Sequence, residues 1–216
     1  MTKLNSTTNI LSDLDGVILD LNYDITFWKE WLPEVLKEKG HGTLEQITAE
    51  LKEHMKAQED GLNWYDLSFW DQLYDVDCLE IIKNQELKCS YLPGSLEALH
   101  KMHELNNPKY ILTNGDPRLF GFKTETESFL KFFDGHICSM EVGYAKEQKE
   151  FWTLASLNLE VDLKNSIFID DNFKVANRAA SCGVGQVYWI TPGRSKRLRN
   201  GIETFPSLRE LAAAVF

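Results

Sequence analysis

The chain has 216 residues, 43% hydrophobic and 26% charged, which suits one large folded domain, or a core domain with a smaller insert, and argues against disorder. Its formal net charge of −10 argues against a nucleic-acid binder, although a bound metal ion and a few lysines could still hold an anionic substrate. No stretch approaches the roughly 18 apolar residues of a membrane span, and no signal peptide is expected. The four cysteines form no CxxC pair, so we expect free thiols, no structural zinc and a cytoplasmic location.

The first predicted element is a buried strand at Ile10–Leu11, which ends in a turn at Asp13-Leu14-Asp15-Gly16. After this turn, residues 22–91 show helical periodicity. In the first part of this segment large apolar residues recur at helical spacing: Phe27, Trp28, Trp31, Leu32, Val35 and Leu36.

Two further helices are predicted within residues 22–91. Thr43 and Gln46 fit a capping box, which opens a helix that continues through Met55. A third helix is predicted from Trp64 to Tyr74.

After Pro93-Gly94 short apolar strands alternate with helices. The predicted helices are Ser95–Leu105, a segment near Glu127–Phe133, a segment near Glu147–Leu157, and Val175–Ala180. The strands that follow them are Tyr110–Leu112, His136–Ser139, Ser166–Ile169 and Gln186–Ile190. This alternation predicts an α/β fold with a doubly wound parallel sheet, whose ligands bind at the carboxyl ends of the strands.

Four polar clusters lie at these strand ends or in a loop beside them: Asp13-Leu14-Asp15-Gly16, Thr113-Asn114, Lys146 and Asp170-Asp171. Carboxylates gathered at one edge of a sheet repel one another without a cation, and a hard ion such as Mg²⁺ prefers such oxygen ligands. A lysine and a hydroxyl beside them would hold a bound anion, so the set favours phosphoryl transfer. Each cluster alone is more often an ordinary turn, cap or solvated lysine; their joint order carries the prediction.

These residues resemble the four motifs of the haloacid dehalogenase (HAD) superfamily. Residues 10–20 resemble the first motif, residues 111–114 the second, Lys146 the third and residues 167–171 the fourth. The resemblance implies a HAD-like Rossmannoid core of residues 1–21 and 92–216, with a small α-helical (type C1) cap of residues 22–91. The chain departs from the usual motifs at Val17, where threonine is commonest, and beside Lys146, where a proline is often found.

The resemblance also implies roles. Asp13 would be the nucleophile that forms an aspartyl-phosphate, and Asp15 the general acid and base, with Thr113 and Lys146 completing the catalytic set. An acid at the position of Asp15 is typical of phosphatases and is lacking in the dehalogenases. The implied phosphate-binding residues are Asp13, Leu14, Asp15, Thr113, Asn114 and Lys146. The implied Mg²⁺ ligands are Asp13, the backbone carbonyl of Asp15, Asp170 and Asp171.

Four of the six tryptophans lie in residues 22–91: Trp28, Trp31, Trp64 and Trp70. Helical spacing makes most of them expected core residues. Trp64 and Tyr65 lie near a predicted loop and are candidates to stack on a substrate base.

More narrowly, the chain resembles the bacterial GMP/IMP 5′-nucleotidases of this superfamily. The segments that carry the likeness are 20–24, 62–65, 143–147, 168–171 and 206–208, with Phe-Trp pairs after the first three. Gly115-Asp116 differs from that family. We therefore expect a Mg²⁺-dependent 5′-nucleotidase for GMP and IMP, as a monomer or small homo-oligomer without nucleic-acid or membrane partners.

The alternatives are a phosphatase for a small sugar phosphate or phosphoglycolate, and a non-catalytic phosphate-binding module. A phosphomutase is less favoured, because no residues for the extra acid–base steps are evident. The basic run Arg194–Arg199 is expected to be a solvated loop or helix end.

Overall fold

The computed structural model describes residues 4–193 and 198–216. Within these residues one sheet of seven strands has the order β3-β2-β1-β4-β5-β7-β6. The strands are β1 Asn9–Ser12, β2 Lys109–Thr113, β3 Gly135–Cys138, β4 Ser166–Asp170, β5 Gln186–Ile190, β6 Leu198–Arg199 and β7 Ile202–Phe205. Neighbouring strands are parallel except for β6, which is antiparallel to β7. The α/β fold with a mostly parallel sheet is confirmed.

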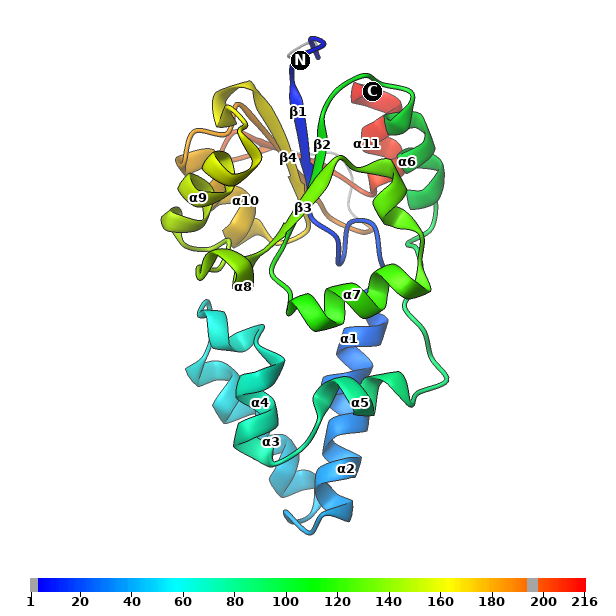
Figure 1. The fold of residues 1–216 in the computed structure, drawn as a ribbon, viewed down its shortest axis with the longest axis vertical. Helices are drawn as coiled ribbons and strands as arrows, with labels where there is room; N and C mark the ends of the chain where they lie inside the picture. The colour runs from blue at the N-terminus through cyan, green and yellow to red at the C-terminus, as the bar shows by residue number, and fades with distance from the viewer. Residues whose placement is uncertain (1–3, 194–197) are drawn as a thin grey trace.

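The central strand β1 pairs with β2 on one side and with β4 on the other. Its side chains alternate between two hydrophobic layers, as expected of a parallel strand covered on both faces. Ile10 packs into the layer beneath α6 (Ser95–His103) and α11 (Leu208–Val215), and Leu11 into the layer beneath α9 (Lys149–Leu159) and α10 (Phe173–Ser181). Figure 1 shows these two helix pairs on opposite faces of the sheet. Because β1, β2 and β4 are parallel, their polar carboxyl ends meet at one edge of the sheet.

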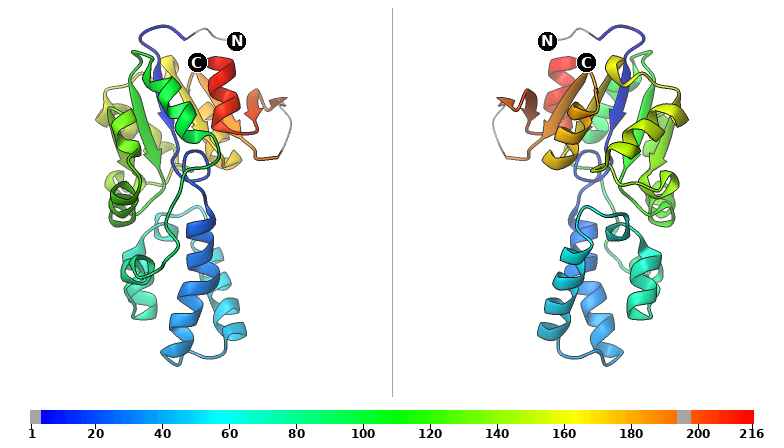
Figure 2. Two further views of the ribbon diagram at one scale, coloured as in Figure 1. Left: turned by 90° about the vertical axis from the view of Figure 1, so that its right-hand side faces the viewer. Right: turned by 90° about the vertical axis from the view of Figure 1, so that its left-hand side faces the viewer.

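Residues 22–91, the helical segment from here on, extend away from this edge of the sheet (Figures 1 and 2). Its helices are α1 Asn22–Thr26, a π-helical turn Phe27–Trp31, α2 Leu32–Glu38, α3 Leu44–Ala57, α4 Leu67–Tyr74 and α5 Cys78–Lys83. The predicted capping box is confirmed, because the Thr43 hydroxyl accepts from Gln46 N and the Gln46 side chain accepts from Thr43 N. Trp70 is fully buried at its centre.

The predicted start of the third helix at Trp64 is wrong. Leu62–Trp64 form a short 3₁₀ turn, and α4 begins at Leu67. The Asp66 carboxylate accepts from Ser68 N at 2.8 Å, so this residue is the N-cap and sets the boundary.

The predicted helix near Glu127–Phe133 is also wrong. The helix here is α7 Pro117–Thr126, and Phe129–Phe132 form only a 3₁₀ turn. Asp116 caps α7 through Arg118 N at 2.8 Å, and Pro117 occupies the first turn, where a missing N–H costs nothing. The short helices α5 and α8 (Ser139–Val142), the strands β6 and β7, and α11 were not predicted. Of the basic run Arg194–Arg199, residues 194–197 lie outside the described residues, and Leu198–Arg199 form β6.

The two chain segments that connect the helical segment to the sheet lie side by side. Asp20 N donates to Ser90 O, and Leu92 N donates to Ile18 O, both at 2.9 Å, around an antiparallel bridge between Leu19 and Tyr91. The helical segment thus leaves and rejoins the rest of the chain at one hydrogen-bonded point.

All four cysteines are free, and Cys78, Cys89 and Cys138 are buried. Among the described residues no helix is both long and apolar enough to cross a bilayer.

Candidate active site

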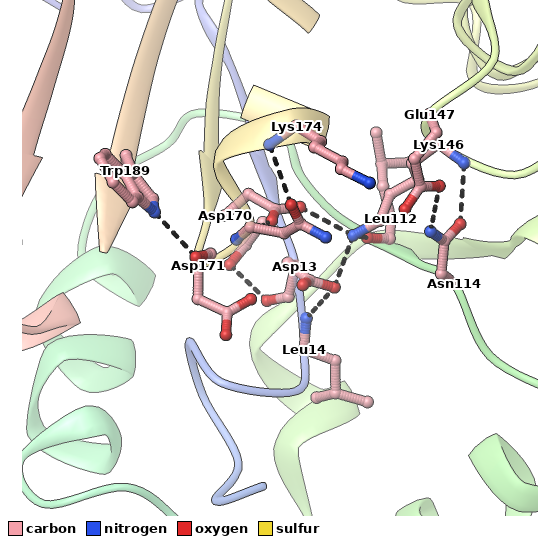
Figure 3. Close-up of polar contacts among 12 residues, drawn as sticks. Asp13, Leu14, Leu112, Asn114, Lys146, Glu147, Asp170, Asp171, Lys174 and Trp189 are labelled. Atoms are coloured by element: carbon pink, nitrogen blue, oxygen red, sulfur yellow. Dashed lines mark hydrogen bonds and ion pairs between the residues drawn. The ribbon is translucent and has the colours of Figure 1, made fainter. Parts of the chain in front are cut away.

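Asp13 is the first residue after β1, and its backbone is fixed by the neighbouring strand. Its N–H donates to the carbonyl of Ile169 in β4 at 2.8 Å, and its Oδ1 accepts from Leu14 N at 2.8 Å. The side chain lies at the polar edge of the sheet beside the loop that follows β4 (Figure 3). A carboxylate oxygen held by the backbone N–H of the next residue keeps one orientation.

Lys146 lies between two of the carboxylates. Its Nζ is 2.8 Å from Asp13 Oδ1 and 2.8 Å from Asp170 Oδ2, and it also donates to Leu112 O at 3.1 Å. Burial by itself would lower the pKa of this ammonium, but Asp13 and Asp170 outweigh burial and raise the pKa. Lys146 is therefore a permanent positive charge at the carboxyl ends of β1 and β4.

Asp13, Asp170 and Asp171 each place a carboxylate oxygen within 4.8 Å of the others. Burial raises the pKa of Asp13 to about 7, that of Asp170 to about 6 and that of Asp171 to about 7, with further raising by neighbouring carboxylates and lowering by Lys146. One lysine does not neutralise three gathered acids, and the donors are all oxygens. The site therefore fits a hard divalent cation.

The loop after β4 is held by two further hydrogen bonds. Asp170 Oδ1 accepts from Asn172 N at 2.7 Å, and the Asp171 carbonyl accepts from Trp189 Nε1 at 2.8 Å (Figure 3). The second bond comes from β5, so two strands fix the direction of this acidic pair.

A second network joins the motif after β2 to the loop of Lys146. Asn114 Oδ1 accepts from Lys146 N at 2.8 Å, and Asn114 Nδ2 donates to Glu147 Oε2 at 2.8 Å. Tyr65, from the helical segment, donates through its hydroxyl to Glu147 Oε1 at 3.0 Å. Glu147 was not predicted as a site residue. In the structure Glu147 connects the helical segment to the motif after β2.

Two adjoining cavities open at this edge of the sheet. The smaller, of about 480 Å³, is lined by Asp13, Thr113, Lys146, Asp170 and Asp171 among others. The larger, of about 740 Å³, is mostly apolar and reaches into the helical segment; Phe27, Trp28, Leu51, Met55 and Trp64 contribute to its wall.

Asp15 lines both cavities, as do Thr113, Asn114 and Tyr65. The Asp15 side chain is 25% exposed, and its Oδ1 accepts from Lys123 Nζ at 2.7 Å. Lys123 was not predicted as a site residue. The Asp15 carboxylate is therefore placed to reach a group bound in either cavity.

The tryptophans of the helical segment separate into two kinds. Trp70 is buried against Trp28 and Tyr74, as expected of a core residue. Trp28 and Trp64 line the larger cavity, and Trp31 packs edge-on against Tyr23. The predicted catalytic, phosphate-binding and metal-ligating residues all line the smaller cavity except Leu14, which lines the larger one and donates its N–H to Asp13 Oδ1. Tyr65 lines both cavities, and Trp64 lines the larger one.

Comparison with known proteins shows the family to which this chain belongs. A family model described as "Hydrolase: haloacid dehalogenase-like hydrolase" matches residues 7–183. The GMP/IMP nucleotidase YrfG of Escherichia coli is 23% identical over 201 residues, which cover 93% of this chain and 90% of that protein. Among solved structures, a HAD phosphatase from Thermococcus onnurineus has a TM-score of 0.82 at 20% identity, covering 96% of this chain and 97% of that one.

Further solved structures share the fold at lower similarity. The magnesium-bound putative HAD-hydrolase YfnB from Bacillus subtilis has a TM-score of 0.64 at 16% identity, covering 97% of this chain and 98% of that one. The L-2-haloacid dehalogenase from Xanthobacter autotrophicus has a TM-score of 0.62 at 15% identity, with the same coverage. The fold alone therefore does not separate phosphate chemistry from dehalogenation.

Proposed function

Because the chain belongs to the haloacid dehalogenase-like hydrolases, we propose that it is a Mg²⁺-dependent phosphatase of purine nucleoside 5′-monophosphates, GMP and IMP, that reacts through Asp13. The observation that carries this proposal is the position of Asp15, at the junction of a polar cavity rich in carboxylates and a large apolar one. The polar cavity fits a phosphoryl group with its cation, and the apolar one fits a nucleoside.

In the proposed reaction an Asp13 carboxylate oxygen attacks phosphorus, and the bond from phosphorus to the ester oxygen breaks. The Asp15 carboxyl gives its proton to that leaving oxygen, which departs as an alcohol. The Asp15 carboxylate then takes a proton from the water that attacks the aspartyl-phosphate, and inorganic phosphate is released. Lys146 and Thr113 hold the phosphoryl oxygens, with the backbone of Leu14 and the side chain of Asn114 beside them.

Asp13, Asp170, Asp171 and the backbone carbonyl of Asp15 would hold Mg²⁺. When bound, the ion would offset the charge shared by these carboxylates and the substrate, so that an anionic nucleophile can approach an anionic phosphoryl group. Burial of the three aspartates together supports this proposal, since without a cation their pKa values lie near neutrality.

We propose that the helical segment, residues 22–91, is a cap over a catalytic core of residues 1–21 and 92–216. The cavity wall that it contributes is aromatic, with Trp28 and Trp64 placed to contact a purine ring. The likeness to the YrfG nucleotidase spans this segment too, which supports a nucleotide over a small sugar phosphate. The free cysteines support a cytoplasmic setting.

The test is release of inorganic phosphate from a panel of nucleoside monophosphates, sugar phosphates and phosphoglycolate, with Mg²⁺, with EDTA, and with the variant Asp13→Asn. Release of chloride from 2-chloropropionate is measured in parallel. We expect turnover fastest with GMP and IMP, abolished by EDTA and by the substitution, and no chloride release. Activity confined to sugar phosphates would overturn the nucleotide assignment only. Chloride release without phosphate release would overturn the phosphatase assignment, and binding of phosphate without turnover of any substrate would indicate a non-catalytic module.

A further inference from the structure

Lys123 is a buried ammonium shared between two carboxylates. Its Nζ donates to Asp15 Oδ1 at 2.7 Å and to Asp24 Oδ1 and Oδ2 at 3.1 and 3.0 Å, and its side chain is only 3% exposed. All the hydrogen bonds that the described residues offer to this ammonium come from these two acids. One carboxylate balances the charge of this ammonium, and the second supplies acceptors for its remaining N–H donors.

The three residues come from three different parts of the fold. Asp15 lies in the turn after β1, Lys123 on α7, and Asp24 on α1 of the helical segment. In Figure 1, α7 lies between the sheet and the helical segment. Lys123 therefore connects the turn that carries the proposed general acid to the first helix of the proposed cap.

Lys123 restrains only one side of the Asp15 carboxyl group. Within the described residues Asp15 Oδ2 has no hydrogen-bond partner, and Asp15 lines both cavities. The ammonium thus fixes the carboxyl through Oδ1 and leaves Oδ2 available to a substrate oxygen. Such an arrangement restricts rotation of the carboxyl group without occupying the oxygen that a general acid uses.

We propose that Lys123 is a positioning residue for proton transfer, which holds the Asp15 carboxyl group toward the leaving oxygen and, through Asp24, makes that orientation depend on the seated helical segment. The proposal rests on the proposed role of Asp15. A substrate that is bound while α1 is displaced would meet an Asp15 that has lost this restraint. Proton donation is then strongest when the helical segment encloses the leaving group.

The alternative is that Lys123 only holds the fold together. Leaving-group dependence separates the two roles. An alkyl phosphate such as GMP needs a proton on its leaving oxygen, whereas p-nitrophenyl phosphate departs as a stabilised phenolate and needs none. A fold-holding residue affects both substrates alike.

The experiment compares kcat/KM for GMP and for p-nitrophenyl phosphate in the wild type, Lys123→Met and Asp24→Asn. If GMP is not turned over, the fastest alkyl phosphate of the panel replaces it. This parameter covers the steps up to transfer of the phosphoryl group to Asp13 and excludes the later hydrolysis, in which Asp15 acts on every substrate. We expect Lys123→Met to lose about 100-fold on GMP and no more than about 3-fold on p-nitrophenyl phosphate. Asp24→Asn should show the same selectivity with a loss of about 5-fold on GMP.

Lys109→Met is the matched control for removal of a buried lysine. Lys109 is buried at the start of β2, where its Nζ donates to Leu105 O at 2.8 Å, and it lies at the opposite end of the strand from the site. Thermal melting and circular dichroism check each variant. If Lys123→Met does not fold, Lys123→Arg and Asp24→Asn decide the question. Lys123→Arg keeps a cation, and Asp24→Asn keeps both the ammonium and the Asp15 carboxylate, while each variant changes the geometry of the cluster. Equal losses on both substrates, or none in either variant, would overturn the proposal.

Asp15→Asn separates this inference from the proposed function. A selective loss on GMP in Asp15→Asn, with equal losses on both substrates in Lys123→Met, would overturn the positioning role alone. Equal losses on both substrates in Asp15→Asn itself would overturn the acid role of Asp15, and with it the inference.

Discussion

The Asp171 carboxylate occupies the space in which a side chain on Gly16 would begin. A Cβ built on Gly16 would lie 2.1 Å from Asp171 Oδ2 and 2.5 Å from its Cγ, and the φ angle of this glycine is +81°. Gly16 thus serves two purposes, because it permits the turn after Asp15 and lets the fourth motif approach the first. We predict that Gly16→Ala lowers kcat/KM on the order of 100-fold, because displacement of Asp171, a proposed Mg²⁺ ligand, would misplace the phosphoryl group of the substrate.

Gly143→Ala is the matched control for this substitution. Its φ is +76°, but among the described residues no atom outside its chain neighbours and its own helix's backbone lies within 4 Å of the Cβ position, so it carries the same backbone strain without the collision. Both variants should lose about 1–3 kcal/mol of unfolding free energy, measured in urea, and only Gly16→Ala should lose activity. Equal activity in the two variants would show that the contact with Asp171 is dispensable.

The stabilising effect of Mg²⁺ should increase with pH. In the metal-free folded protein Asp13 and Asp171 have pKa values of about 7, against 3.8 for an ordinary aspartate. Their contribution to stability is therefore fully present below about pH 3.8 and is lost as the pH rises through 7. If these carboxylates hold Mg²⁺, as proposed, the ion competes with protons for them, so the rise in Tm on adding it should be larger at pH 8 than at pH 6.

Asp171→Asn is the comparison for this measurement, with Tm recorded by scanning fluorimetry at both pH values. It removes one acid from the cluster and should lose most of the Mg²⁺-dependent shift. A shift of the same size at pH 6 and pH 8 in the wild type would argue that these three carboxylates are not the ligands.

The tryptophans of the cavity wall and of the helical core should respond differently to truncation. Trp28→Ala and Trp64→Ala are expected to raise KM for GMP by about 10-fold or more, since loss of an aromatic contact removes about 1–3 kcal/mol, with little change for glycerol phosphate. Trp70→Ala should instead destabilise the protein by about 3–5 kcal/mol, because this side chain is fully buried. Steady-state kinetics on both substrates and urea unfolding distinguish the outcomes.

The hydrogen bond from Tyr65 to Glu147 should contribute to catalysis by holding the helical segment against the core. It is 3.0 Å long and has a carboxylate acceptor, for which a net contribution of about 1.5–3 kcal/mol is typical. We predict that Tyr65→Phe and Glu147→Gln each lower kcat/KM for GMP and that the double variant is less impaired than the sum of the two. Strict additivity in this double-mutant cycle would mean that the two side chains do not act together.

The five predicted strands were located from the sequence within one residue of their observed positions, because each is a short apolar run and three of them, β1, β2 and β4, end in a polar cluster. β5, for example, was predicted at Gln186–Ile190 and is observed there. The helix α7 was missed, since its apolar residues are few and its main signal is the capping pair Asp116-Pro117. The aromatic run around Phe129 was mistaken for a helix, whereas it forms a 3₁₀ turn whose rings fill the core.

The residues of the candidate site likewise include some that the sequence predicted and some that it missed. Asp13, Lys146 and Asp171 could be found because the order of motifs along the chain is itself a signal. Lys123 and Glu147 could not, because their hydrogen-bond partners in the site lie more than 30 residues away, and no local pattern distinguishes them from surface residues. Asp116 illustrates the same limit, since it accepts a hydrogen bond from Leu67 N in the helical segment as well as capping α7.

The bridge between Leu19 and Tyr91 has a consequence for how this architecture can diversify. Because the two ends of the helical segment pair with each other at Leu19 and Tyr91, the segment is a closed loop inserted between β1 and β2. Lengthening a closed loop costs only about 0.6 kcal/mol for each doubling of its length, so helices can be added or replaced there without disturbing the strands. The chemistry after β1, β2 and β4 can therefore remain constant while the walls of the larger cavity change, and new substrates can be gained by remodelling one insertion.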